Sequence, residues 1–216
     1  MPYFGYDNNW YISIRRRTMK LSESKHAVSY KSVIDRKLSS GQAQKVWQRA
    51  EKNYDDLLQE NPDHTKAVAQ HTYVSIFPAI AVYKAMQSCG VEDAMSIMEE
   101  GAANLSGKRG KTYAGMLKIP GMKSLFMKIF ATGMRSGFGP EAGFTERFIT
   151  ETSRELKVDV TKCSYTDYCA KYGCPELVHV FCKNDEYAYG NLPGIQFLRT
   201  QTLGTGGRCC DFHFKR

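Results

Sequence analysis

The sequence predicts an α+β fold, in which an N-terminal helical half precedes an antiparallel sheet with packed helices. Between Gly41 and Ser106 the apolar residues recur at helical spacing. From Arg147 onward, several segments alternate apolar and polar residues, which is typical of strands. Helices followed by strand pairs favour an α+β domain over an alternating α/β arrangement.

The helical half contains three predicted helices. The first covers residues 41–60, and the strongly apolar stretch 64–88 supplies the second. Pro78 must start, kink or break a helix within that stretch, because proline lacks the backbone N–H. The third helix is expected at residues 91–106. The Met- and Gly-rich stretch 114–140 is interpreted as core packing broken by loops, with an adaptable pocket wall as the alternative.

The second half predicts one antiparallel sheet and a helix packed on it. Residues 147–151 and 154–162 alternate and are joined by a hairpin turn, and a Gly-rich turn joins two further alternating segments. Strands are therefore expected at 147–151, 154–162, 195–203 and 208–215, with a helix at 175–189.

A chain of 216 residues suits one domain. Residues 1–22 lack a clear apolar period and are interpreted as a flexible leader. Residues 23–216 then form a single domain with a helical part, 23–142, and a sheet-containing part, 143–216.

The net charge of +8 comes from scattered basic residues, apart from Arg15–Arg17 and a cluster at Lys108–Lys111. Without a nucleic-acid motif, this charge indicates a solvated surface with modest attraction for anions, so no nucleic-acid partner is expected. An apolar run of about 18 residues is absent, and so is a secretory signal. We therefore expect a cytoplasmic protein without a membrane partner and with reduced thiols. The sequence leaves a homo-oligomer open.

Six of the seven cysteines fall between positions 163 and 210, interleaved with acids and a histidine. On a helix beginning near Pro175, His179, Cys182 and Asp185 follow each other at intervals of three and share one surface. A histidine beside a cysteine can lower the thiol pKa, and an acid can serve as a general base. The competing interpretations are a buried structural thiol at Cys182 and a packing role for His179.

Two further cysteines adjoin predicted strands. Cys163 directly follows the strand that ends at Lys162, where functional groups often lie. On the last strand Cys210 shares a face with two phenylalanines, and Asp211 points to the opposite face. Asp211 is either a site residue or a structural hydrogen-bonding acid.

The cysteine spacing is a weak match to a zinc site. Structural zinc sites usually pair cysteines two to four residues apart, and Cys169 and Cys174 have four residues between them. Whether Cys163, Cys182 and Cys210 meet in space does not follow from their spacing. We expect no cofactor, with zinc as the alternative.

Several segments together resemble one known family. They are Asp159–Cys163, Cys174–Leu177, Phe181–Asp185, Phe197–Leu203 and Gly206–Phe212. From Gly143 to the end the chain resembles the L-2-amino-thiazoline-4-carboxylic acid hydrolase family, and residues 1–40 lie outside the resemblance.

The resemblance implies a hydrolase that opens a small cyclic C–N substrate, such as an aminothiazoline ring. The ring carbon is amidine-like and electrophilic, so a thiolate or an activated water can add to it. The substrate is expected to carry a carboxylate, which needs a cation. The candidate catalytic residues are Cys163, His179, Cys182, Asp185, Cys210 and Asp211, and the candidate substrate-binding residues are Arg147, Tyr165 and Arg199.

The C-terminal hairpin is also similar to the 4-vinyl-reductase-type small-molecule-binding domains. Some of those sensors bind zinc with a Glu and a Cys on the penultimate strand. Here Arg199 and Thr202 stand at the approximate positions of those ligands. The alternative function is therefore a non-catalytic, sensor-type module that binds a small molecule, with zinc assistance in doubt.

Overall fold

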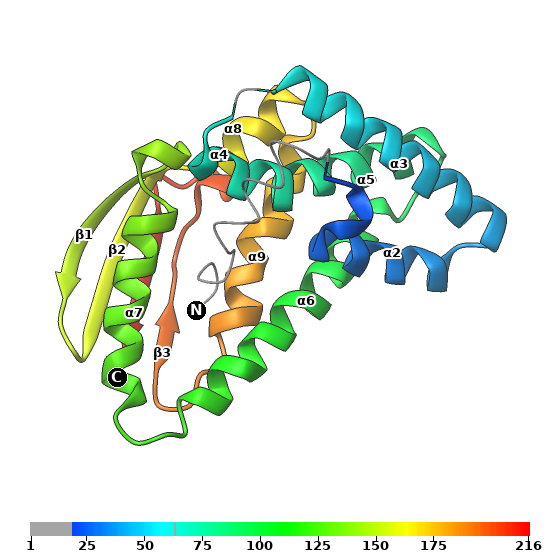
Figure 1. Cartoon of the computed structure of the whole chain (residues 1–216). Helices are drawn as coiled ribbons and strands as arrows, with labels where there is room; N and C mark the ends of the chain where they lie inside the picture. Colours follow the sequence, from blue (N-terminus) through cyan, green and yellow to red (C-terminus); the bar gives the residue numbers. More distant parts are fainter. Residues whose placement is uncertain (1–18, 63) are drawn as a thin grey trace.

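The computed structural model describes residues 19–62 and 64–216. It is an α+β structure with the sheet at one end, and Figure 1 shows α6 and α9 running between the sheet and helices α2, α3 and α5. Residues 1–18, most of the expected leader, lie outside the described residues. Of the remainder of that segment, Met19 and Leu21 are buried in the core.

The elements follow the expected order of helices before strands. They are η1 (Leu21–Glu23), α2 (Lys25–Lys37), α3 (Ser40–Glu60), α4 (Lys66–His71), a π-helical turn (Thr72–Ile76), α5 (Phe77–Ser88), α6 (Ala94–Met116), α7 (Met122–Gly137), η3 (Pro140–Ala142), β1 (Thr145–Glu151), β2 (Glu155–Lys162), α8 (Ser164–Lys171), η4 (Pro175–Leu177), α9 (Val178–Tyr189), β3 (Gln196–Leu198), η5 (Leu203–Thr205) and β4 (Cys210–Lys215).

The predicted strands form one antiparallel sheet in the order β1-β2-β4-β3. Leu156, Val158 and Val160 of β2 are buried on one face, as their alternation predicted. Helix α7 lies over β1 and β2 (Figure 1), and Phe130 of α7 packs against Phe214 of β4 with ring centroids 4.5 Å apart. The hydrophobic core of this half therefore lies between α7, α9 and the sheet.

Strand β3 is shorter than the predicted segment 195–203, because a side chain replaces the backbone ladder. It ends at Leu198, after which the carboxylate of Asp211 accepts hydrogen bonds from the backbone N–H groups of Thr200 and Gln201, both at 2.9 Å. Those N–H groups would otherwise need carbonyl partners on β4.

The helices at 41–60 and 175–189 are confirmed, although the latter begins with the 3₁₀ turn η4. The expected end of α6 at Ser106 is wrong, because the helix continues to Met116. The stretch 114–140 holds a regular 16-residue helix, α7, rather than packing broken only by loops. A further short helix, α8, follows β2 and was not expected from the sequence.

Pro78 lies just after the start of α5 and follows the π-helical turn. Proline has no N–H with which to satisfy the carbonyl four residues earlier, which belongs to Val74. The Ser24 hydroxyl donates to that carbonyl at 2.9 Å and also accepts from Ala27 N as the N-cap of α2. The carbonyl that Pro78 leaves without an α-helical partner is therefore linked to the start of α2.

Helices α6 and α9 pack at close backbone distance around Gly110. A methyl group at this position would lie 2.7 Å from the carbonyl oxygen of Tyr187 and 3.1 Å from that of Ala188. A glycine is needed here because both neighbouring atoms belong to the backbone and cannot rotate away. Its helical propensity is poor, but the close approach to α9 requires it.

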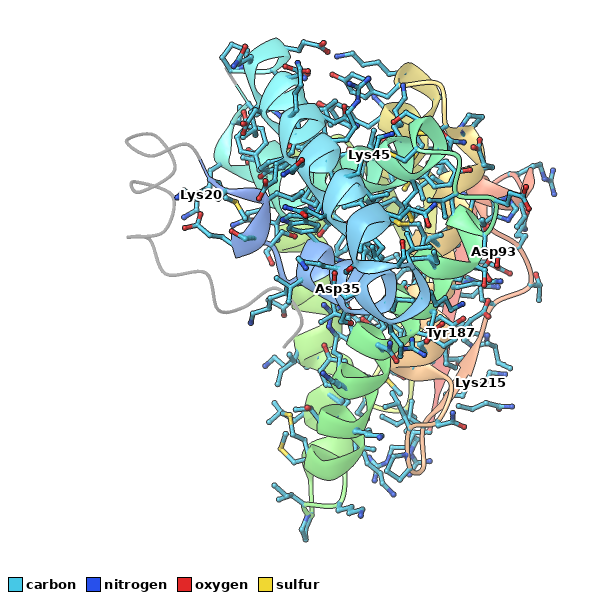
Figure 2. The ribbon with its side chains drawn as sticks, turned by 90° about the vertical axis from the view of Figure 1, so that its right-hand side faces the viewer. Lys20, Asp35, Lys45, Asp93, Tyr187 and Lys215 are labelled. Atoms are coloured by element: carbon cyan, nitrogen blue, oxygen red, sulfur yellow. The ribbon has the colours of Figure 1, made fainter. Side chains whose placement is uncertain are left out.

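The outer surface of the helical part is polar. Figure 2 shows charged side chains projecting from it, and Asp35 on α2 and Lys45 on α3 are both exposed. None of the described helices combines the length and the hydropathy that crossing a bilayer requires.

Two glycine substitutions on α6 test the close contact. Gly110→Ala should lower the free energy of unfolding by about 1–3 kcal/mol, since the added methyl group meets the α9 backbone. Gly107→Ala, on the same helix with no atom within 4 Å of the added group, should raise it by up to about 1 kcal/mol. Urea unfolding followed by circular dichroism measures both. Equal effects of the two substitutions would contradict the close α6–α9 contact.

Candidate functional site

A cavity of about 120 Å³ lies between α9, α7 and the inner face of the sheet. Its size is of the order of an apolar cavity of about 150 Å³ that accepts benzene, so it suits a small ring. Its wall is mainly aromatic and aliphatic, and a set of polar groups interrupts it at one side. These polar groups include His26, Arg109, Asn184, Asp185 and Arg199.

Six of the nine residues predicted for the site line this cavity. They are Cys163, Tyr165, Cys182, Asp185, Arg199 and Cys210. They come from the strand end before α8, from α8, α9 and the segment after β3, and from the start of β4. From its place on the apolar edge of the predicted helix, the Cys182 sulfur was expected at a pocket, within reach of Asp185, His179 or Cys163. Of these three, Asp185 and Cys163 line the cavity with it, and a role for Cys182 in a reaction stays a prediction.

The other three predicted residues do not line the cavity. His179 is exposed on the surface of α9, because the apolar side of that helix points to the core. Arg147 lies on the outer face of the sheet, where it pairs with Asp159 at 3.3 Å and remains 72% exposed. Asp211 points to the same outer face and holds the segment after β3 through Thr200 and Gln201.

Arg199 joins the segment after β3 to α9 through three oxygen atoms. Its guanidinium donates to Asp185 Oδ2 at 2.8 Å, to Glu186 Oε1 at 2.8 Å and to the carbonyl oxygen of Cys182 at 2.9 Å. The Arg199 side chain is only 4% exposed. Two carboxylates already occupy this cation, which therefore orients Asp185 more readily than it could bind a further acid.

Asp185 is the one carboxylic acid among the described residues that line the cavity, and its pKa lies close to neutral pH. Burial raises its pKa to about 6, against the lowering effect of the Arg199 and Arg109 charges. By contrast, burial lowers the pKa of His26 to about 3, with the Arg109 charge adding to the effect. Asp185 is consequently the better candidate for a group that gains and loses a proton during a reaction.

The three cavity thiols are held in their neutral form. Burial raises the pKa of Cys163 and of Cys182, and raises that of Cys210 to about 12. Arg199 and the neighbouring Thr202 lower the pKa of Cys182 without reversing the effect of burial. None of the three therefore meets the condition for an activated thiolate.

Tyr165 is fixed in the cavity wall by a buried histidine. His71 Nε2 lies 2.6 Å from the carbonyl oxygen of Gly137, to which it must donate. Burial lowers the pKa of His71 to about 4, so the ring is neutral and its Nδ1 accepts from the Tyr165 hydroxyl at 3.2 Å. Tyr165 also packs against Phe181, with ring centroids 4.7 Å apart.

The other cysteines do not add to the cavity. Cys169 and Cys174 are fully buried next to each other at the end of α8, and Cys89 and Cys209 do not line the cavity either. Among residues 19–62 and 64–216, no three His, Cys, Asp or Glu side chains come together to form a metal site.

The comparison with protein families matches residues 69–214 to a model described as L-2-amino-thiazoline-4-carboxylic acid hydrolase. The match covers more than half of the chain, from α4 to β4. The chain belongs to this family. Neither the curated proteins nor the solved structures provide a match. The cavity residues Arg109, Asp185 and Arg199 lie within the family region, and His26 lies outside it.

Sequence reasoning missed His26, Arg109 and Asn184. Arg109 belongs to a basic cluster that the sequence alone assigns to a solvated surface, and His26 has no partner at a recognisable spacing. A cue was available only for Asn184, which lies on the same helix as Cys182 and Asp185. It accepts a hydrogen bond from Ser106 of α6 at 2.8 Å.

Asp211 should prove to be structural. Burial opposes ionisation, but hydrogen bonds from Thr200 and Gln201 hold the pKa of Asp211 below its usual value. Asp211→Asn weakens these charge-assisted bonds and should lower the free energy of unfolding by about 1–2 kcal/mol. Its neighbour in the sheet, Asp159, provides the control, because Asp159→Asn breaks only the pair with Arg147, whose side chain is 72% exposed, and should cost about 0.5 kcal/mol or less. Thermal unfolding compares the two, and an unchanged melting temperature in Asp211→Asn would contradict a structural role.

Proposed function

We propose that the protein is a hydrolase that opens a small, carboxylate-bearing heterocycle with an amidine-like ring carbon, using a water molecule activated by Asp185. The observation that carries the proposal is the cavity itself, in which an acid with a pKa raised to about 6 borders an aromatic wall. Membership of the L-2-amino-thiazoline-4-carboxylic acid hydrolase family supports the reaction class. An aminothiazoline carboxylate is the substrate that we would test first.

The reaction uses one water and moves both of its protons, one of them by way of Asp185. The water oxygen bonds to the ring carbon while Asp185 accepts a proton, which then passes to the ring nitrogen. The tetrahedral adduct collapses to a carbonyl group, one ring bond breaks, and the hydroxyl proton moves to the departing ring heteroatom. Asp185 ends in its starting form, and the product is the opened ring plus the elements of water.

Water is a better nucleophile for this site than the Cys182 thiol. Covalent catalysis would require a thiolate, and burial holds the pKa of Cys182 above its ordinary value. The Cys182 sulfur also packs closely against Gly204, because a methyl group added to this glycine would lie only 2.9 Å from the sulfur. We therefore assign Cys182, together with Cys163 and Cys210, to the wall of the cavity.

The carboxylates that bind Arg199 provide a matched test. Asp185→Asn should lower kcat/KM for 2-aminothiazoline-4-carboxylate by about a hundredfold or more, because the variant cannot accept a proton. Glu186→Gln removes the other carboxylate bound to Arg199. The Glu186 side chain is 62% exposed and does not line the cavity. This variant should keep kcat/KM within about threefold. Comparable losses in the two variants would show that the ion pair, rather than the base, matters.

The pH dependence of kcat/KM follows from the same group. Asp185 acts only when ionised, so activity should fall as the pH drops through about 6 and should persist on the alkaline side. The negative charge of Glu186 raises the pKa of Asp185, so Glu186→Gln should move the midpoint to lower pH. A midpoint that does not move in this variant would assign the ionisation to the substrate instead.

A non-catalytic binding module is distinguished by two measurements. Such a module would bind the heterocycle in the same cavity, with affinity detectable by calorimetry, and would release it unchanged. Binding without ring opening in the wild-type chain, at any pH from 5 to 9, would favour the binding module over the hydrolase. Turnover that Cys182→Ser abolishes while its fold persists would instead return the reaction to a thiol nucleophile.

A further inference from the structure

We propose that Arg109 and His26 form a subsite that binds the carboxylate of the substrate, at the side of the cavity where α2, α6 and α9 meet. The identity of the ligand rests on the function proposed above. The subsite itself is argued from the placement of two side chains that the ring-opening steps do not use. In this proposal Arg109 and His26 bind the substrate carboxylate, whereas Arg199 orients the base, Asp185.

Arg109 is placed by the packing of α6 on α9. The neighbouring Gly110 meets the α9 backbone, and Ser106, one helical turn earlier, bonds to Asn184 of α9. These residues mark the side of α6 that faces α9, and Arg109 lines the cavity beside them. The guanidinium charge is close enough to act on both His26 and Asp185. Arg109 therefore brings a positive charge to the same chamber as the proposed base.

His26 is placed by the first turn of α2. Ser24 caps this helix and is tied to the carbonyl oxygen of Val74, and α2 packs along α6. Close packing is visible at Gly101 of α6, where an added methyl group would meet the Tyr30 ring of α2 at 2.5 Å. Exposed charges add to the contact, since Lys37 of α2 pairs with Glu100 of α6 at 3.1 Å.

His26 has an unmet hydrogen-bonding group at the cavity. The side chain is only 9% exposed, and its Nδ1 has no hydrogen-bond partner among the described residues. A buried ring nitrogen without a partner costs free energy, and native proteins seldom leave one unless a ligand or a water completes it. A neutral imidazole carries one N–H, which can donate to a carboxylate oxygen. A bound acid would thus satisfy His26 while it pairs with Arg109.

The geometry disfavours the cations expected from the sequence for this role. Arg199 is buried against Asp185 and Glu186, and Arg147 lies on the outer face of the sheet. Carboxylates are bound well by a guanidinium together with a second donor, because both oxygens are then satisfied. Arg109 and His26 provide this combination at a wall of the cavity, so a substrate acid can bind there while its ring extends toward Asp185.

The experiment uses two probes that differ only in the acid group, thiazolidine-4-carboxylate and thiazolidine. Neither contains the amidine carbon, so binding to the full chain can be measured by calorimetry without ring opening. Arg109→Gln should weaken the carboxylate probe on the order of tenfold to a hundredfold, and His26→Phe by about tenfold. Both variants should leave the affinity for thiazolidine within about twofold. Lys108→Gln, an exposed neighbour of equal charge, should leave both probes unchanged.

The subsite is wrong if the variants weaken both probes equally, if neither variant weakens the carboxylate probe, or if Lys108→Gln has the same effect. Should Arg109→Gln fail to fold, Arg109→Lys keeps the charge but loses the paired donors, and it should still weaken the carboxylate probe alone. If the variants weaken only the carboxylate probe but the wild-type chain opens no ring, the subsite is supported and the proposed hydrolase function is wrong. If Arg109→Gln opens the ring with an unchanged KM, the subsite proposal is wrong and the hydrolase proposal is unaffected.

Discussion

The buried guanidinium of Arg199 is the interaction on which the arrangement of the site depends. Arginine cannot give up its proton in a protein, and an unpaired buried charge costs several kcal/mol, so acceptors must surround it. Helix α9 supplies them from Cys182, Asp185 and Glu186, whose spacing of three and four residues places them on one helical surface. This requirement fixes the distance between the segment after β3 and α9, and it turns Asp185 toward the cavity.

The position of Arg199 depends in turn on a side chain outside the cavity. Asp211 of β4 points to the outer face of the sheet, yet its carboxylate holds the backbone of Thr200 and Gln201 beside Arg199. The sheet is therefore linked to the cavity through a chain of contacts from Asp211 to the backbone of Thr200 and Gln201, and from there to Arg199 and Asp185. Such a residue can resemble a catalytic acid in a loss-of-function experiment, although it does not line the cavity.

Local patterns in the sequence were enough for the helix-then-sheet order, and together with the family resemblance they named six residues that line the cavity. Periodicity reports which face of an element is apolar, and Cys182 and Asp185 share one helix, so their proximity is a local property. The length of α6 could not be predicted from local patterns. Glycine is a poor helix former, and the reason for Gly110 is the close contact of α6 with α9, which only the folded structure shows. The shortening of β3 depends on Asp211, and alternation alone could not distinguish its structural role from a catalytic one.

The position of α2 at the cavity shows why some site residues could not be predicted from the sequence, since it depends on contacts between distant parts of the chain. Pro78 leaves the carbonyl of Val74 without its helical partner, and Ser24 supplies a hydroxyl to it. The same hydroxyl caps α2, so the proline at the start of α5 is linked to the start of α2, where His26 lies. Ser24 and Val74 are fifty residues apart in the chain. His26 therefore has no signature at short spacing, and it is the burial of its Nδ1 without a partner among the described residues that marks it in the folded molecule.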